Sequence, residues 1–432
     1  MFPRASSLPF PANEAKHRRE LEAAIGIVER ACRICVDVQS SVRSSEAASV
    51  EKSDSTPVTI ADFGVQAFVS FELHQAFPAI PLVAEEDSGF LRANNLVDSV
   101  LGVVADKSSS DKPLTRAQVL EAIDRGGKNA IVYENKPATY WILDPIDGTK
   151  GFLKGSGALY VVGLALVVEG EIVLGVMGCP NWDDSESFQS ITGVSNALNR
   201  AGIVMAAHIG CGTWRRRFQD GHQSESTDPS FHDWSRCLVD RCLLASQARF
   251  CMTDSATWES LPLSPFFSTT TDAAGDGSGR SVVLLKACCG RYIMVALGIA
   301  SVFILLAKPR ISTKVWDHAV GLICVHEAGG KGLNLTLQRM VWSEDPISCS
   351  WSSCNQWQDP QPDRGDDFCE FLRWMSPGRF DSAKMKASLK FRDEQKPLFR
   401  AKVPLSILGL PFQCGIVAGE DDDGGAARTM MG

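Results

Sequence analysis

Apolar residues near the start of the chain recur with helical spacing. Leu21, Ile25 and Val28 are separated by three or four positions, which predicts an amphipathic helix over residues 14–39. The same spacing recurs further along, and the helix that precedes Pro78 has a clear stop. These further helices are predicted over residues 58–77, 88–104, 115–124 and 317–328.

Short apolar runs without helical spacing predict strands. Two of them, residues 81–84 and 140–143, lead directly into acidic residues. Residues 159–168 and 171–178 are joined at Glu169-Gly170, which is typical of a hairpin. Further strands are expected over residues 203–208 and again after 280.

This mixture of helices and antiparallel strands predicts a layered α/β (α+β) fold. We expect an N-terminal lobe over residues 1–178 and a second lobe over 179–330. From residue 331 to 432 the apolar period is lost, and this part is predicted to be an anomalous, poorly ordered tail.

Composition narrows the class of protein. The 432 residues are 44% hydrophobic and 22% charged, as in globular domains. A net charge of −8 argues against binding a nucleic-acid polymer, whose phosphates attract basic surfaces. The 14 cysteines follow no regular spacing, which favours reduced thiols in a cytoplasmic protein, while the Ser- and Arg-containing start leaves organelle targeting open.

One uncharged segment raises the question of a membrane span. Residues 292–307 number only 16, fewer than the roughly 20 that cross a bilayer as a helix. We therefore expect no membrane association, and we expect a monomer.

Acidic residues follow the predicted buried strands. Asp144 and Asp147 lie in D-P-I-D-G-T, where Pro and Gly turn the chain so that both carboxylates approach one point. Glu85 and its neighbours follow the strand before, and Asp317 starts a helix. Carboxylates suit Mg²⁺ that bridges to a phosphate, and the free N–H groups after Gly148 can hold an anion.

Each acidic position also has an ordinary structural interpretation. Asp317 is a candidate helix N-cap, residues 85–87 a solvated loop, and Asp144 with Asp147 a pair of turn formers. Cys32 and Cys35 form a C-x-x-C that fits helix packing better than zinc or redox chemistry. His208 is a candidate nucleotide contact, or a histidine packed at a strand end.

Four stretches carry a resemblance to a known family. DPIDGTKGF (residues 144–152) and WDHAVGLICVHEAGG (316–330) resemble the two signatures of the inositol monophosphatase-like, Mg²⁺-dependent and lithium-sensitive phosphatases. SDSTPVTIAD (53–62) and VAEED (83–87) are similar to two further family stretches. AIDRGG, GVMGCPNW, AHIGCGTW and CCG resemble the plant-type 3'(2'),5'-bisphosphate nucleotidases, and the likeness covers residues 14–330.

The resemblance implies a stacked αβαβα sandwich of the sugar-phosphatase type with the site between its lobes. It also implies two or three Mg²⁺ ions, and water activated by metal that removes the 3'(2')-phosphate of adenosine 3'(2'),5'-bisphosphate, leaving AMP. Asp54 and Thr149 are then the acid/base residues, and Gly148, Thr149 and Arg291 contact the substrate. The implied metal ligands are Glu85, Asp144, Asp147, Asp317 and the carbonyl of Ile146.

The substrate side departs from the family pattern. About three residues are missing where Gly290 runs into Arg291, and a family Arg is replaced around Leu305. The His-bearing stretch has no counterpart around residues 254–258. An inositol phosphate phosphatase and a catalytically weakened nucleotide-binding relative therefore remain alternatives.

The end of the chain departs further. Relatives close with a strand-rich segment that is not recognisable in residues 331–432, so we expect one sheet to lack its last strands and to expose an edge.

Overall fold

The computed structural model describes most of the predicted lobes and a short part of the tail. The described residues are 8, 10, 16–42, 50–51, 57–105, 107, 114–127, 139–154, 158–182, 202–218, 234–241, 249–252, 282–284, 288–307, 313–334, 341–342, 348–350 and 413–419. Among them, no helix combines the length and the apolar character needed to cross a membrane.

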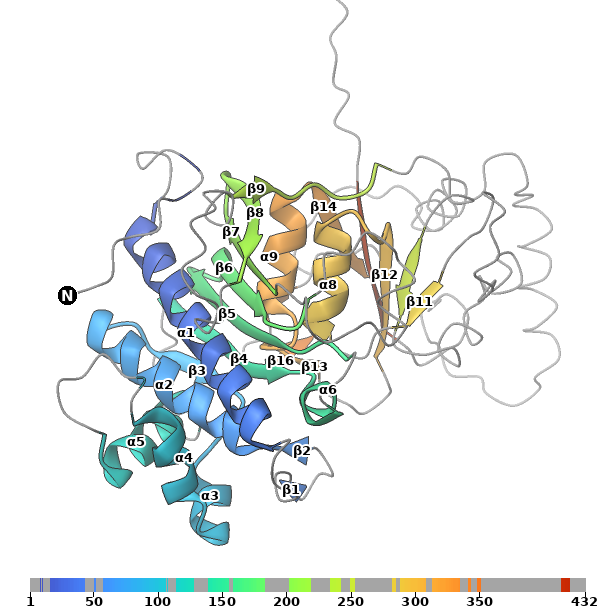
Figure 1. Cartoon of the computed structure of the whole chain (residues 1–432). Coiled ribbons are helices and arrows are strands. Elements are labelled where there is room, and N and C mark those ends of the chain that lie inside the picture. Colours follow the sequence, from blue (N-terminus) through green and yellow to red (C-terminus); the bar gives the residue numbers. More distant parts are fainter. Residues whose placement is uncertain are drawn as a thin grey trace, which may run out of the picture.

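A seven-stranded sheet lies at the centre of the molecule (Figure 1). Its first two strands are parallel and the others antiparallel. In spatial order they are β3 (Leu82–Ala84), β4 (Thr139–Asp147), β5 (Val161–Val168), β6 (Glu171–Cys179), β7 (Ile203–His208), β8 (Gly212–Arg217) and β9 (Ser235–Arg236).

Helices cover both faces of this sheet. One face carries α1 (Arg18–Val42) and α2 (Ile60–Ala76), and the other carries α8 (Cys288–Ala296) and α9 (Ala319–Glu327). Shorter helices surround α2 or follow the strand ends. They are α3 (Gly89–Asn94), α4 (Val97–Val104), α5 (Arg116–Gly126) and α6 (Thr149–Lys154).

A second, five-stranded sheet packs against α8 and α9, on the side away from the first sheet (Figure 1). The resulting layers confirm the α/β class. Among the described residues no helix lies on the outer face of the second sheet, so the fifth layer stays a prediction. The strands in order are β11 (Val282–Leu284), β10 (Phe250–Met252), β12 (Val302–Ala307), β17 (Gln413–Gly419) and β14 (Gly330–Asn334).

Strand β17 corrects the expectation for the tail. It pairs antiparallel with β12 on one side and with β14 on the other, from Val302↔Ala418 to Asn334↔Gly415. The sheet therefore does not lack a closing strand between β12 and β14. Sequence analysis missed it because β17 is separated from β14 by a long stretch without apolar period, and a short apolar run does not reveal its distant partners.

Two small sheets complete the described structure. β1 (Val50–Glu51) pairs with β2 (Pro57–Val58), just before α2. The other joins three short strands, β13 (Thr313–Lys314), β16 (Ser348–Ser350) and β15 (Val341–Trp342).

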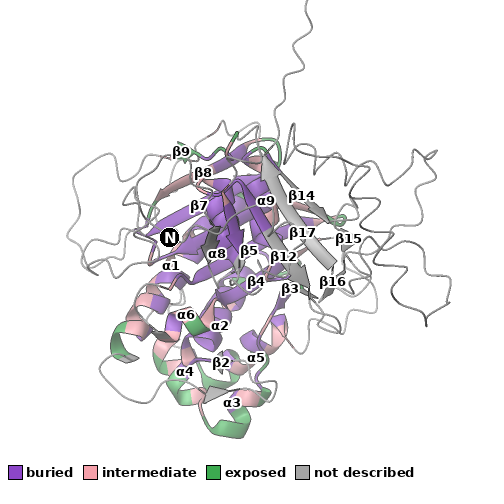
Figure 2. Ribbon diagram, turned by 90° about the vertical axis from the view of Figure 1, so that its right-hand side faces the viewer, coloured by how far each residue is buried: buried purple, intermediate pink, exposed green. Residues whose placement is uncertain are grey.

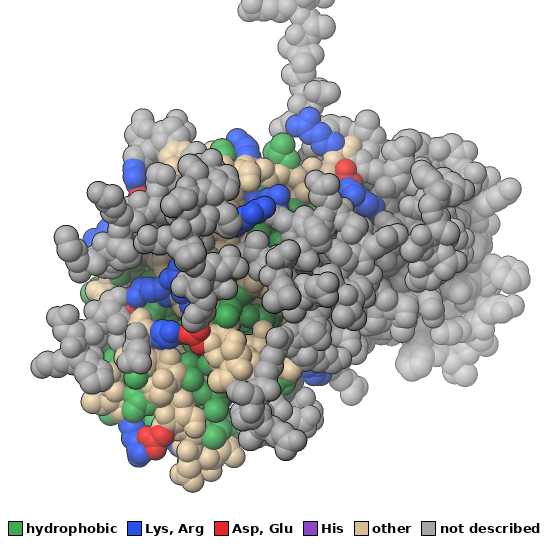
Figure 3. All heavy atoms as spheres, viewed as in Figure 1, with side chains coloured by type: hydrophobic (Ala, Val, Ile, Leu, Met, Phe, Trp, Pro, Cys, Tyr) green, Lys and Arg blue, Asp and Glu red, His purple; other side chains and the backbone are tan. Residues whose placement is uncertain are grey.

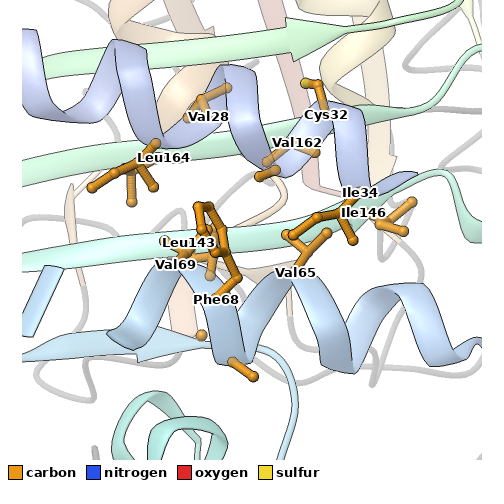
Figure 4. Packing of buried hydrophobic residues seen from close by; sticks show 14 of the residues in the cluster. Val28, Cys32, Ile34, Val65, Phe68, Val69, Leu143, Ile146, Val162 and Leu164 are labelled. Carbon is orange, nitrogen blue, oxygen red and sulfur yellow. The ribbon is translucent and has the colours of Figure 1, made fainter. Parts of the chain in front are cut away.

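The alternation of side chains along the central strands divides the interior into two cores. On β4, Trp141 and Leu143 face α1 and α2, whereas Ile142 faces α8 and α9. Figure 4 shows the first core, where Phe68 of α2 lies against Leu143 and Val28 of α1 lies near Leu164. Each such fully buried aliphatic or aromatic side chain contributes about 1.5–3 kcal/mol of transfer free energy.

Helix α2 is buried along nearly its whole length, because α1, α4, α5 and the sheet surround it (Figure 2). It starts with a capping box: the Thr59 hydroxyl accepts the N–H of Asp62, and the Asp62 carboxylate accepts the N–H of Thr59 at 2.8 Å. It ends at Ala76, before Pro78, as predicted.

The other element predictions differ from the structure mainly at their limits. The hairpin is confirmed, with Glu169 and Gly170 both at positive φ in the turn. The single helix expected over 88–104 is instead two helices, because Asn95 adopts a left-handed conformation that ends the first. Cys32 and Cys35 are fully buried in α1 and His208 is 1% exposed, so both fit the packing interpretation.

Candidate functional site

An irregularity at the end of β4 places two of the predicted ligands. Asp144 pairs with Gly163 and Asp147 with Val161, so three steps along β4 match two along β5. Residues three apart on a regular strand point to opposite faces, and the extra residue reverses the alternation. Asp144 and Asp147 consequently lie close enough for each charge to affect the other.

Asp144 is a buried acid whose pKa is strongly perturbed. It is 1% exposed, and its Oδ1 has no hydrogen-bond partner among the described residues. Burial raises its pKa well above the ordinary value, and neighbouring carboxylates raise it further. In order of effect these are the carboxylates of Glu85, Asp147, Asp317 and Asp62.

Glu85 is brought to Asp144 by parallel strands. β3 pairs with β4 in the register Ala84↔Leu143, so the next residues, Glu85 after the end of β3 and Asp144 within β4, lie at the same level of the sheet. The following residue, Glu86, is 3% exposed. The interpretation of residues 85–87 as a solvated loop is therefore wrong for Glu86.

Asp317 arrives from the opposite layer. Helix α9 packs closely over β5, where a Cβ added to Gly163 would lie 2.8 Å from a methyl group of Val320. Asp317 precedes this helix, and His318 rather than Asp317 occupies the N-cap. Burial, Asp147 and Glu85 raise the pKa of Asp317, while Lys314 and Arg291 lower it.

Thr149 faces a carboxylate that sequence analysis did not select. The Thr149 hydroxyl lies 3.2 Å from Oδ1 of Asp62 and 3.2 Å from the carbonyl oxygen of Ile146. Asp62 is 1% exposed and accepts two hydrogen bonds from Thr59 through its other oxygen. The sequence did contain a signal for Asp62, because this residue ends the S-D-S-T-P-V-T-I-A-D stretch. The same position, however, is also explained by a role in capping the helix.

The remaining predicted positions differ in what the structure places around them. Asp54 lies outside the described residues, so its acid/base role stays a prediction. Gly148 directly precedes α6, and its carbonyl accepts the N–H groups of Gly151 and Phe152 at 2.7 and 3.0 Å. Arg291 is only 3% exposed, with its guanidinium 4.8 Å from the centre of the Phe303 ring.

The start of α8 also contacts the acids. The backbone N–H of Cys289 donates to Oδ2 of Asp147 at 2.5 Å. Cys289 belongs to the C-C-G stretch, so this stretch is placed directly against D-P-I-D-G-T. Gly290 and Arg291, where family residues are missing, lie within a continuous helix.

A buried tyrosine–histidine pair lies beside Asp317. The Tyr292 hydroxyl lies 3.1 Å from Nδ1 of His318, and both side chains are 2% exposed. Burial and the charge of Arg291 lower the pKa of His318 to about 3. The imidazole is therefore neutral near pH 7, and the tautomer decides which of the Tyr292 hydroxyl and Nδ1 donates to the other.

The donor set fits a hard divalent cation, although it does not yet enclose one. Within the described part of the chain no three acidic, histidine or cysteine side chains are arranged so that they could hold a metal ion. The carboxylates that raise the pKa values of Asp144 and Asp317, with one Asp144 oxygen unpartnered, are nevertheless a set that a cation stabilises. Such clustering without a cation is electrostatically unfavourable.

Positive charge does not gather into one tract on the surface seen in Figure 3. Lys and Arg side chains appear there in several separate places over the described residues. Arg216, from the basic run of β8, pairs with Glu29 at 2.6 Å and stacks on Trp234. That run is therefore partly engaged in packing.

Comparison with known proteins adds independent findings. The inositol monophosphatase family model matches residues 18–358, which extends the likeness beyond the limit of 330 found from motifs. An Arabidopsis thaliana protein named as a mitochondrial 3'(2'),5'-bisphosphate nucleotidase is 58% identical over 330 residues, 76% of this chain and 79% of the relative. A 3'(2'),5'-bisphosphate nucleotidase of Oryza sativa is 32% identical over 72% of this chain and 82% of its own. A Thermotoga maritima IMPase structure superposes with a TM-score of 0.45 at 18% identity, over 77% of this chain and 90% of its own.

Proposed function

This chain belongs to the inositol monophosphatase family, and from that premise we propose that it is a 3'(2'),5'-bisphosphate nucleotidase. Its substrate would be adenosine 3'(2'),5'-bisphosphate, hydrolysed to AMP and phosphate. The observation that carries the phosphatase chemistry is the buried Asp144 carboxyl, surrounded by other carboxylates at the end of β4. The preference for a nucleotide is supported by the names of relatives that match over most of their length.

We assign the cation to the acids at the ends of β3 and β4 and before α9. Glu85, Asp144, Asp147 and Asp317 would hold Mg²⁺, with the carbonyl of Ile146 as a further ligand. When bound, Mg²⁺ lowers the pKa of a coordinated water and offsets negative charge on the phosphate. The number of ions, expected as two or three, belongs to the proposal.

The chain's own residues orient and deprotonate the attacking water. When the Thr149 hydroxyl donates its one proton to Asp62 and not to the carbonyl of Ile146, a lone pair on its oxygen is left to accept a hydrogen bond from water. As water attacks phosphorus, its proton passes to Thr149 and the Thr149 proton to Asp62. We therefore place the base at Asp62, whose second oxygen is held by Thr59.

The backbone after Asp147 is proposed to contact the phosphate. Gly148 directly precedes α6 and Thr149 begins it, and the first N–H groups of this helix are not used within it. Arg291 is assigned to the substrate side as predicted, but its burial favours a long-range electrostatic effect over direct contact.

The decisive experiment measures phosphate release from three substrates in Mg²⁺. Adenosine 3',5'-bisphosphate should be hydrolysed best, inositol 1,4-bisphosphate and inositol monophosphate less, and Li⁺ should inhibit. Asp144→Ala serves as the blank. Release no greater than this blank from every substrate would refute the phosphatase proposal, and preference for an inositol phosphate would refute the nucleotidase proposal alone.

Compartment and assembly are proposed separately. The relative with 58% identity carries a mitochondrial location in its name, which supports an organelle over the cytoplasm for this chain. Fractionation of cells that express the full chain would decide between them. We propose a monomer, to be tested by light scattering of the purified protein.

A further inference from the structure

The side chain of Gln66 is fully buried and makes three hydrogen bonds with backbone groups. Its Oε1 accepts the N–H of Glu86 at 2.8 Å, and its Nε2 donates to the carbonyl of Glu86 at 2.5 Å. Nε2 also donates to the carbonyl of Ile123 in α5 at 2.9 Å. The Gln66 amide therefore bonds both the N–H and the carbonyl of Glu86, as the backbone of a neighbouring strand would.

The residue held in this way follows a proposed metal ligand. β3 ends at Ala84, Glu85 comes next, and Gln66 holds Glu86 immediately afterwards. Gln66 also lies one helical turn after Asp62, so both project from the same face of α2. One helix thereby contributes the proposed base and a support for the Glu85 segment.

A second contact holds the other end of this segment. Asp124 of α5 accepts the N–H of Ser88 at 2.8 Å and its hydroxyl at 2.7 Å. The end of α5 approaches so closely that a Cβ on Gly127 would lie 2.0 Å from the carbonyl oxygen of Glu86. Glu86 and Ser88 are consequently held by α2 and α5, on either side of the exposed Asp87.

We propose that Gln66 is a positioning residue that, with Asp124, holds Glu85 against Asp144 and Asp317 in readiness for the cation. This inference rests on the proposed metal site. Glu85 is the carboxylate with the largest effect on Asp144, so repulsion tends to move it outward before a cation binds. The three hydrogen bonds of Gln66 oppose that movement, and a buried amide has no water to replace them.

The test compares Gln66→Met with a matched control. Methionine has a similar length but makes none of the three hydrogen bonds. Thr213→Val removes one hydrogen bond, 2.6 Å to the carbonyl of Cys324, from a residue that is equally buried but lies on β8. For each full-length variant we would measure Mn²⁺ affinity by electron paramagnetic resonance, the metal-free melting temperature, and kcat and KM with adenosine 3',5'-bisphosphate.

Gln66→Met is expected to bind Mn²⁺ about 10–100-fold more weakly, as for other groups that orient metal ligands. Saturating Mg²⁺ should restore most of kcat. Thr213→Val should lower the melting temperature but leave Mn²⁺ affinity within about 2-fold of wild type, the outcome expected when only packing is disturbed.

Mn²⁺ affinity of a folded Gln66→Met protein within the range of the control would overturn the inference. If this variant does not fold, Asp124→Ala takes its place, because it removes both hydrogen bonds to Ser88. The expected loss is about 10-fold, the lower end of the same range, and unchanged affinity there would likewise overturn the inference. If the wild-type protein binds metal and releases phosphate, and the variant binds metal equally well, the inference alone is refuted. If the wild-type protein neither binds metal nor releases phosphate, both the proposed function and this inference are refuted.

Discussion

The candidate site has two sides that are built differently. The strand side comes from the sheet and α2, and the helix side comes from α8 and the start of α9. The strand side consists of Asp62, Glu85, Asp144, Asp147 and Thr149, and the helix side of Arg291, Tyr292, Asp317 and His318. On the strand side, Asp144 is surrounded by carboxylates, whereas on the helix side Asp317 also has Lys314 and Arg291 nearby.

This difference shows where a cation is needed most. Both carboxyl groups have raised pKa values because both are buried, but nearby positive charge lowers the pKa only at Asp317. On the strand side, the Asp62 carboxylate instead accepts the backbone N–H of Thr59, and the Gln66 side chain holds the backbone of Glu86, next to Glu85. We infer that the strand side positions the groups that react with the substrate. The helix side supplies one further ligand, Asp317, whose negative charge is partly offset by nearby positive side chains.

The largest expected effect comes from neutralising the centre of the strand side. Asp144→Asn should reduce Mg²⁺-dependent hydrolysis about 10³-fold or more, since metal assistance is worth several kcal/mol. The same change should raise the melting temperature of the metal-free protein, because it removes a repelled buried charge. Phosphate release and calorimetry in excess chelator would measure both. A fall in both quantities would mean that Asp144 is structural.

The next effect separates the proton path from metal binding on the same side. Thr149→Val should lower kcat about 10²–10³-fold, since it removes the hydroxyl that links water to Asp62. Thr149→Ser keeps the hydroxyl and should retain most activity, which makes it the matched control. Mn²⁺ affinity of both variants should stay near that of wild type. Equal loss in both variants would contradict a role for the hydroxyl.

On the helix side, His318 makes metal-free stability depend on pH. Its folded pKa is about 3 and its unfolded pKa is near 6.5, so between these values the unfolded state binds the extra proton. This contribution to the free energy of unfolding is present above pH 6.5 and is lost as pH falls toward 3.

Urea denaturation of wild type and His318→Asn at pH 5.0 and 7.5 measures this effect. Wild type should lose more stability than the variant on acidification. Asp144 and Asp317 act in the opposite direction, because their raised pKa values favour the folded state in acid, but they are common to both proteins. A pH dependence that is identical in the two proteins would contradict a neutral buried imidazole.

The smallest effect concerns the support of His318. Tyr292→Phe removes the hydroxyl that is hydrogen-bonded to Nδ1 and should lower the free energy of unfolding by about 1–2 kcal/mol. Because Asp317 is positioned mainly by the packing of α9 and not by this hydrogen bond, kcat should change no more than about 3-fold. Denaturation curves and steady-state kinetics would test this. A loss of activity as large as in Thr149→Val would show that the two sides do not differ as described.

Local sequence patterns predicted helices, strands and turns well where the residues that decide the structure lie within one short segment. The hairpin at Glu169-Gly170 and the stop of α2 before Pro78 are confirmed, because turn chemistry and proline act over a few residues. The long-range partners of β17 could not be predicted in this way. Its place between β12 and β14 depends on pairing across a large separation in sequence.

The candidate site was predictable to a similar extent. Asp144, Asp147 and Glu85 come at or after apolar strand segments. The structure brings Glu85 to Asp144 because β3 and β4 are parallel, and Asp147 to Asp144 because the β4–β5 register shifts between them. Asp62 was missed because a residue in a capping box has a sufficient local explanation. Only the contact with Thr149, across 87 positions in sequence, reveals its second relationship.

The sequence by itself determined which residues are acidic, which segments form most of the strands and helices, and which family the motifs resemble. Those properties depend on residue type and short spacing. The tertiary structure decided which acids share one buried environment, that Arg291 is inside and not on the surface, and that Gln66 supports the Glu85 segment. These outcomes depend on burial and distance between remote segments, because desolvation and charge repulsion arise only when folding brings the groups together.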